Sequence, residues 1–185
     1  EWAEIKFQVI SHQSIVNSEN SQHKLTTIDY GLETISVFTT RPDTLFGVTY
    51  VVLAPEHELV EKLKNQIKNW DEVQKYVEKS KKTEQIDRTN AEREKTGVKL
   101  EGIFAINPVN KEEVMVYIAD YVLADYGTGA VMAVPAHDDR DFEFAKKYNI
   151  EIRNVIKPET EVDNNTAFIG NGIMINSGKF SGKKS

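Results

Sequence analysis

Cysteine is absent from this chain of 185 residues. A disulfide scaffold and a thiolate metal site are therefore excluded, and a reducing compartment suits the chain. Long apolar runs are also absent, because the longest, Val48 to Ala54, is far shorter than the roughly 20 residues of a membrane-spanning helix. Excess basic charge is missing as well: the formal net charge is −6, which argues against a large phosphate-tracking surface. We expect a cytoplasmic protein with no membrane partner and at most a small contact with nucleic acid.

What is present fits one folded domain, since 39% of the residues are hydrophobic and 28% are charged. Neither end resembles a natural terminus. No Met precedes Glu1, and the tail 177–185 ends in polar residues. We therefore expect residues 1–185 to form a single domain excised from a larger protein.

Hydrophobic periodicity predicts clustered strands with helices inserted between them. Strands are predicted over 5–10, 33–40, 44–53, 99–106, 113–123, 130–134 and 150–156. Helices are predicted over 55–82, 89–97 and 138–148, and the polar stretch 11–24 is predicted to be a loop or hairpin connection. Regular alternation of strand and helix is missing. The pattern favours an α+β fold, a mostly antiparallel sheet or barrel with peripheral helices.

The first segment with candidate chemistry is 39–44 (TTRPDT), between two predicted strands. Threonine hydroxyls can orient a water molecule or donate to a developing oxyanion, and Arg41 can pair with a phosphate. Pro42 stiffens the turn. On composition alone, a polar turn around Asp43 is the commoner explanation of such residues.

The second segment is 126–141 (YGTGAVMAVPAHDDRD). Gly127 and Gly129 permit a positive φ or a close backbone approach, but Gly-x-Gly without a third glycine is a weak sign of phosphate binding. Met132 and Val134 lie two apart on a predicted strand and therefore share a face. They either line a small apolar pocket or belong to the ordinary core.

Acidic residues follow in the same segment. Asp138 is placed to cap the next helix, while Asp141 either completes that cap or faces a ligand amine. His137 beside these carboxylates raises the question of a metal site. One histidine without a second histidine at helical spacing or any cysteine is a poor ligand set, so no metal is predicted.

Together, the two segments resemble the editing insertion of class I aminoacyl-tRNA synthetases for aliphatic amino acids. The leucyl enzyme of bacterial or organellar type is the closest match, because valyl and isoleucyl relatives usually differ from RPDT and from AVMAVPxHDxRD, both of which are intact here. Weaker resemblance extends over nearly the whole chain. It implies a β-barrel-like editing domain inserted in a Rossmann body, which hydrolyses the ester of tRNA(Leu) mischarged with isoleucine, valine, norvaline or methionine and excludes leucine.

The resemblance also implies what surrounds the domain. The synthetic-site signatures HIGH and KMSKS are absent from this sequence. No cofactor is therefore expected in this domain, and ATP and magnesium would bind elsewhere in the full synthetase. The expected partners are the 3′ CCA end of tRNA(Leu) with its aminoacyl group and the remainder of the synthetase in cis, in a monomer.

Catalytic roles are likewise implied by the resemblance. Thr39 and Thr40 would hold the ester and the attacking water, and Asp141 would anchor the α-ammonium of the substrate. No side chain is identified as a general base.

The substrate-binding positions follow from the same family pattern. Arg41 would steady the tRNA 3′ end. Thr44 would exclude leucine by a clash with its branched side chain. Such a second site is needed because a hydrophobic pocket separates substrates that differ by one methylene by only about 1–3 kcal/mol. The remaining binding positions are Met132 and Val134 in the same pocket, Tyr126 near the terminal adenosine, and Asp138.

Two other hypotheses remain. The first is a non-catalytic tRNA-binding insert with a decayed site. The second is the editing domain of a valyl or isoleucyl enzyme. The intact threonine pair and Asp141 argue against decay, and a panel of mischarged tRNAs distinguishes the enzymes.

Overall fold

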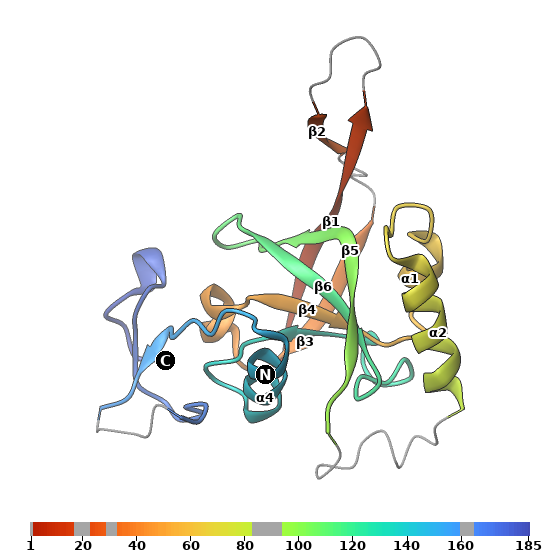
Figure 1. The fold of residues 1–185 in the computed structure, drawn as a ribbon. Coiled ribbons are helices and arrows are strands. Elements are labelled where there is room, and N and C mark those ends of the chain that lie inside the picture. The colour runs from red at the N-terminus through yellow and green to blue at the C-terminus, as the bar shows by residue number, and fades with distance from the viewer. Residues whose placement is uncertain (1, 17–22, 29–32, 83–93, 160–164) are drawn as a thin grey trace.

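The computed structural model describes residues 2–16, 23–28, 33–82, 94–159 and 165–185 (Figure 1). The strands are β1 (Ala3–Val16), β2 (His23–Ile28), β3 (Thr34–Thr39), β4 (Tyr50–Leu53), β5 (Gly97–Ile106), β6 (Glu113–Ala119), β7 (Ala130–Ala133), β8 (Ile156–Lys157) and β9 (Ile173–Met174). The helices are η1 (Pro42–Gly47), α1 (Glu58–Lys62), α2 (Trp70–Lys81), α4 (Asp139–Tyr148) and η2 (Gly178–Phe180).

Seven strands form one sheet in the order β2-β1-β5-β6-β4-β7, with β3 also paired to β1. Every pairing is antiparallel except that of β4 with β6, which is parallel. β3, which pairs with β1 off this path, lies close to β7 at the far end of the path. The sheet is thus a nearly closed, mostly antiparallel barrel with a few helices, as the sequence predicts.

β4 lies at the centre of two apolar clusters. Val51 and Leu53 pack inside the barrel. Tyr50 and Val52, which alternate with them, face α4. Side chains of a strand alternate between faces, so a strand buried on both faces must be apolar throughout. This requirement explains the unbroken apolar run of β4.

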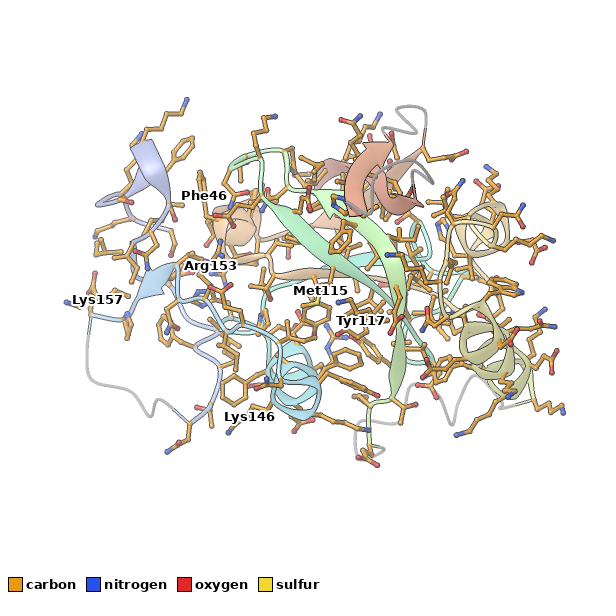
Figure 2. All side chains as sticks on the ribbon, turned by 45° about the horizontal axis from the view of Figure 1, so that its top comes forward. Phe46, Met115, Tyr117, Lys146, Arg153 and Lys157 are labelled. Atoms are coloured by element: carbon orange, nitrogen blue, oxygen red, sulfur yellow. The ribbon has the colours of Figure 1, made fainter. Side chains whose placement is uncertain are left out.

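The helices cover the barrel from outside (Figure 1). α1 and α2 lie together on one flank, and α2 packs against β5. α4 covers the other apolar cluster, where Tyr117 of β6 points toward it (Figure 2) and meets Phe144 edge to face at 5.5 Å between ring centroids. Within the described residues, no helix is long and apolar enough to cross a bilayer.

The strand predicted over 44–53 is wrong in its first half. Residues Pro42–Gly47 form the 3-10 helix η1, and only Tyr50–Leu53 form a strand. Pro42 stands in the first helical turn, where its missing N–H removes no hydrogen bond. Thr44 closes the turn, because both its N–H and its hydroxyl donate to the carbonyl of Arg41.

The continuous helix predicted over 55–82 is also wrong, since residues 63–69 separate α1 from α2. Contacts with β5 hold this break in place. The Asn69 side chain donates to the Lys99 carbonyl and accepts from the Glu101 N–H, and the Lys68 N–H donates to the Glu101 carbonyl. Tertiary hydrogen bonds therefore override the helical spacing.

The strand predicted over 150–156 is wrong except at its last residue, where β8 begins. The N–H groups of Val155 and Ile156 donate to the ring of His137 instead of to a neighbouring strand. The helix predicted over 138–148 is confirmed, but its most buried aromatic is Phe144, whereas Phe142 is only half-buried.

Near the N-terminus, the connection predicted over 11–24 is shorter than expected. β1 continues to Val16, and β2 begins at His23 and pairs with it. The two strands extend as a hairpin beyond the body of the sheet (Figure 1). The short helix predicted over 89–97 falls largely outside the described residues, and Gly97 begins β5.

Asn107 fixes η1 to the turn between β5 and β6. Its fully buried amide donates to the Leu45 carbonyl at 2.8 Å. We expect Asn107→Ala to lower the free energy of unfolding by about 1–3 kcal/mol, because it leaves a buried carbonyl without a donor. Asn110→Ala, at a half-buried position of the same turn, should change it by less than about 0.5 kcal/mol. Equal effects in urea unfolding would contradict this role for Asn107.

Candidate functional site

One cavity gathers both candidate segments. It has a volume of about 490 Å³. Every site residue predicted from the sequence lines it: Thr39, Thr40, Arg41, Thr44, Tyr126, Met132, Val134, Asp138 and Asp141. The remaining lining residues are Trp2, Phe38, Tyr121, Val122, Leu123, Val131, His137 and Arg140.

Closure of the barrel explains why these distant segments meet. Segment 39–44 leaves the end of β3, and segment 126–141 contains β7 and the start of α4. Because β3 and β7 come together where the barrel closes, the two segments face each other there. The cavity thus lies at the seam between the two ends of the sheet.

Two threonines hold the backbone of Arg41 between them. The Thr39 hydroxyl accepts from the Arg41 N–H at 2.9 Å, and the Thr44 hydroxyl donates to the Arg41 carbonyl at 2.9 Å. A hydroxyl that accepts a hydrogen bond still has its own proton to donate. Thr39 can therefore donate into the cavity, whereas the Thr44 proton is used within the turn.

The apolar part of the cavity is formed by Thr44, Met132 and Val134. Thr44 exposes 0% of its surface to solvent, so it closes the cavity and does not stand at its mouth. With its hydroxyl bound to the Arg41 carbonyl, the methyl group is the side-chain group of Thr44 that remains outside this hydrogen bond. Val134 is buried, and Met132 is half-buried.

The Arg41 guanidinium is held on both sides. It forms an ion pair with Asp43 at 2.8 Å and donates to the Ile169 carbonyl at 3.1 Å. The loop at residue 169 thereby reaches the site from far along the sequence. A guanidinium held in this way presents a fixed positive charge to a phosphate.

Asp141 is a buried carboxylate at the start of α4, with 6% of its surface exposed. One carboxylate oxygen accepts from the Val134 N–H at 2.8 Å. Burial, followed by the nearby charge of Asp138, raises the pKa of Asp141 from 3.8 to about 8, while the Val134 bond and Arg140 act in the opposite direction. The cavity therefore contains a carboxyl group without enough compensating positive charge.

Two phenols stand beside this carboxyl group. The Tyr50 hydroxyl donates to the Asp141 carbonyl at 3.2 Å. Burial and then the charge of Asp141 raise the pKa of both Tyr50 and Tyr121 above the usual value for tyrosine. Both phenols thus remain neutral and add no further negative charge beside Asp141.

Asp138 caps α4, which was one of its two predicted roles. Its carboxylate accepts from the N–H groups of Arg140 and Asp141 and pairs with the Arg140 guanidinium at 3.1 Å. This pair keeps a cation at the cavity edge, since Arg140 is largely exposed.

The pKa of Asp141 predicts a pH dependence of stability. The unfolded chain loses this proton near pH 3.8, but the folded chain keeps it until about pH 8. Between these values the folded state binds more protons, so stability falls as pH rises. Asp141→Asn removes this loss. We expect its free energy of unfolding to exceed that of the wild type by an amount that grows between these pH values and levels off above, on the order of a few kcal/mol. A difference that does not vary with pH in urea unfolding would contradict the buried carboxyl.

The mouth of the cavity is aromatic. Trp2, Phe38 and Tyr126 line it, and Tyr126 is 78% exposed. Tyr126 begins a tight turn in which Gly127 and Gly129 have φ of 63° and 68°, as their glycine identity suggests.

His137 fastens the C-terminal segment to the wall of the cavity. Nδ1 lies 2.9 Å from the Phe168 carbonyl, and Nε2 accepts from the Val155 N–H at 3.1 Å. Burial lowers its pKa, which keeps the ring neutral, as these bonds require. Both ring nitrogens are thus occupied by backbone groups. Among the described residues, no group of three or more His, Asp or Glu side chains could hold a metal ion.

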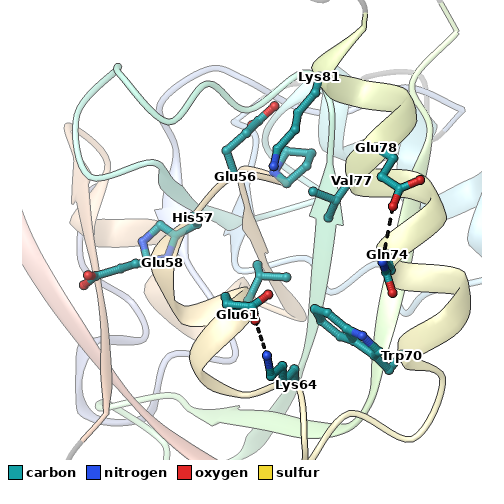
Figure 3. A pocket seen from close by; sticks show the side chains of 12 residues that line it. Glu56, His57, Glu58, Glu61, Lys64, Trp70, Gln74, Val77, Glu78 and Lys81 are labelled. Carbon is teal, nitrogen blue, oxygen red and sulfur yellow. Dashed lines mark hydrogen bonds and ion pairs between the residues drawn. The ribbon is translucent and has the colours of Figure 1, made fainter.

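A second cavity, of about 420 Å³, lies between α1 and α2 (Figure 3). Trp70 and Val77 line it together with several glutamates, two of which bond to Lys64 and Gln74. Neither candidate segment reaches it. The hydroxyls of Thr39 and Thr40 and the carboxyl group of Asp141 line the first cavity.

Three of the lining residues that sequence reasoning missed are Phe38, Arg140 and Tyr121. Phe38 was hidden in an apolar strand, although its alternation with the inward Val37 and Thr39 could have indicated an outward ring. Arg140 lies within the second segment, next to the two aspartates that were singled out. Tyr121 carries no local signal.

Comparison with known proteins points to one family. A family model described as "Leucyl-tRNA synthetase, editing domain" matches residues 13–185. A leucine–tRNA ligase of Rubrobacter xylanophilus is 49% identical over 188 residues, covering 100% of this chain and 22% of that protein. One of Petrotoga mobilis is 50% identical over 159 residues, covering 84% of this chain and 19% of that protein. The chain spans about a fifth of the length of these curated relatives.

A solved structure is also similar. It is a crystal structure of a ternary complex of the Agrobacterium radiobacter K84 agnB2 LeuRS with tRNA and LeuAMS. The TM-score is 0.59 at 29% sequence identity, over 88% of this chain and 17% of that chain.

Proposed function

Because the chain belongs to the leucyl-tRNA synthetase editing-domain family, we propose that it hydrolyses the ester of tRNA(Leu) mischarged with isoleucine, valine, norvaline or methionine and spares leucyl-tRNA(Leu). One observation carries the proposal. A single cavity combines the buried carboxyl of Asp141, the hydroxyl of Thr39 and an apolar end closed by Thr44. This combination suits an amino acid with a free ammonium, an ester and a small side chain.

Asp141 binds the α-ammonium of the substrate. Arg140 does not offset the burial of this carboxyl group, which raises its pKa to about 8. A bound ammonium supplies the missing charge, lowers this pKa and brings Asp141 to its ionised form. Binding therefore selects an esterified amino acid with a free amino group.

Thr39 and Thr40 orient the ester and the attacking water. The water oxygen bonds to the ester carbonyl carbon while a threonine hydroxyl donates to the developing oxyanion. The bond from that carbon to the ribose oxygen then breaks, and the ribose oxygen takes the proton that the attacking water gives up. The products are the free amino acid and tRNA with its terminal hydroxyl restored. General-base help adds about 10²–10⁴-fold in enzymes, and an activated ester reacts without a dedicated base.

Thr44 excludes leucine at the closed end of the cavity. Its methyl group has no solvent exposure, and its position is fixed by the hydrogen bond to Arg41. A branch at Cγ of leucine meets this methyl group, whereas the unbranched norvaline side chain passes it.

The domain acts as part of a cytoplasmic leucine–tRNA ligase. Relatives about five times longer support this setting. The rest of the ligase brings the 3′ CCA end of tRNA(Leu) to the cavity, where Arg41, Tyr126 and Asp138 contact or frame it. ATP and magnesium serve the synthetic site elsewhere, and the hydrolysis requires no cofactor.

Deacylation of a panel of charged tRNAs tests the proposal. The chain should release isoleucine, valine and norvaline from tRNA(Leu) faster than buffer does and leave Leu-tRNA(Leu) intact. No release above buffer would identify a decayed, tRNA-binding insert. Preference for mischarged tRNA(Val) or tRNA(Ile) would instead assign the domain to a valyl or isoleucyl enzyme.

A further inference from the structure

Exposed apolar side chains gather around the mouth of the editing cavity. Five large hydrophobic residues are exposed among the described residues, and Trp2, Phe38 and Tyr126 all line this cavity. A fourth, Ile169, is tied to the same place through the bond from Arg41 to its carbonyl. Contiguous exposed apolar surface on a water-soluble domain usually marks a binding surface.

Phe38 is held in place by the strand that carries it. It lies directly opposite Glu4 of β1, between the inward-facing Val37 and Thr39. A Cβ at Gly127 would lie 3.9 Å from Phe38 Cδ2, so the glycine turn passes near one edge of the ring. Strand pairing thus positions the residue that carries the ring.

The ring of Phe38 has an open face. It is 48% exposed, and no aromatic ring in the described part of the chain stacks on it. A phenylalanine that served only the core would be buried by its neighbours.

Two cationic side chains line the same cavity as Phe38. They are Arg41 and Arg140, and each is held by a neighbouring aspartate. Aromatic faces next to cations are the means by which proteins bind unpaired nucleotides, because bases stack on the rings and phosphates pair with the cations.

We propose that Phe38 is a stacking residue for the base of the penultimate nucleotide of the tRNA 3′ end. This inference rests on the proposed function, in which the cavity receives the terminal adenosine and its amino acid. A volume of about 490 Å³ is in the range of sites that hold one ligand of that size. Phe38 stands at the rim, so the base that it meets is the one next to the terminal adenosine in the tRNA.

Two substrates distinguish a loss of base stacking from a general defect of the cavity. One is norvalyl-adenosine, which lacks a penultimate base, and the other is a norvalylated dinucleotide of cytidine and adenosine. For the dinucleotide, Phe38→Ala should raise KM about 5- to 150-fold with kcat unchanged, and for norvalyl-adenosine both constants should stay at the wild-type values. Phe38→Trp should retain the low KM, and Phe38→Leu should not.

Val109→Ala is the matched control, because Val109 is also exposed and apolar but does not line the cavity. It should leave both substrates unaffected. An unchanged KM for the dinucleotide in Phe38→Ala would overturn the inference. An equal loss with norvalyl-adenosine would do the same, because it would indicate a disturbed cavity.

Binding of an uncharged oligonucleotide decides the question without hydrolysis. The probe ends in CCA and has a fluorescent cytosine analogue at the penultimate position, whose emission falls on stacking. Wild type and Phe38→Trp should quench it, and Phe38→Ala should not. If the wild type quenches but hydrolyses no ester, the proposed function fails and the stacking inference stands. If the wild type does not quench, the stacking inference fails.

Discussion

Asp141→Asn is expected to reduce deacylation of Ile-tRNA(Leu) by about 30-fold to several thousand-fold. Removing one partner of a buried charge pair costs about 2–5 kcal/mol, and each 1.36 kcal/mol is a tenfold change in rate. Asparagine has nearly the shape of aspartate, and its amide oxygen can still accept from the Val134 N–H. The variant thus removes the charge and leaves the surroundings in place. The measurement is kcat/KM with mischarged tRNA.

Two controls make the loss specific to the ammonium. The variant should unfold at no lower urea concentration than the wild type, because the raised pKa of Asp141 indicates that its charge is unfavourable in the empty site. Asp139→Asn, at the exposed start of the same helix, should retain activity. Full activity in Asp141→Asn would remove Asp141 from the ammonium role.

Thr44→Ala is expected to hydrolyse Leu-tRNA(Leu) about 10- to 200-fold faster than the wild type does. This range corresponds to the discrimination that one methyl-sized contact provides in an apolar pocket. Hydrolysis of Ile-tRNA(Leu) should change much less, because that substrate is already accepted. The measurement is the initial rate of leucine release from correctly charged tRNA.

Serine and valine at position 44 show which atoms exclude leucine. Thr44→Ser keeps the hydroxyl that donates to the Arg41 carbonyl but lacks the methyl group, so it should admit leucine. Thr44→Val keeps a methyl group and lacks the hydroxyl, so it should still exclude leucine if the turn holds its shape. Continued exclusion by both Thr44→Ala and Thr44→Ser would assign discrimination to another residue.

Local patterns predicted the elements that depend on local chemistry. The alternation of Ile35, Val37 and Thr39 gave the inward face of β3, and Asp138 marked the start of α4. Gly127 and Gly129 indicated a turn with positive φ. In each case, propensity and tertiary packing act in the same direction.

Tertiary contacts determined the rest. A β-like apolar pattern continues through Thr44 and Leu45, but hydrogen bonds to Arg41 and Asn107 turn these residues into η1. The bond between Arg41 and residue 169 joins positions 128 apart in sequence, which no local window contains. The family resemblance brought together residues of the two segments, and the nearly closed barrel gives the physical reason why they meet.

The burial of Asp141 was the least predictable feature of the site. In the sequence it is one of several aspartates at the start of a helix, where most such residues are exposed. Its depth follows from the way α4 lies against Tyr50 and the end of β7. A raised pKa results from that packing and is visible only in the folded chain.

A crystal structure of the chain with a non-hydrolysable norvalyl-adenosine analogue would show whether this cavity holds the substrate. The analogue should occupy the cavity at the barrel seam, with its ammonium in hydrogen-bond contact with Asp141 and its side chain against Thr44. An empty cavity at saturating analogue, or an ammonium remote from Asp141, would contradict the claim that this cavity is an editing site.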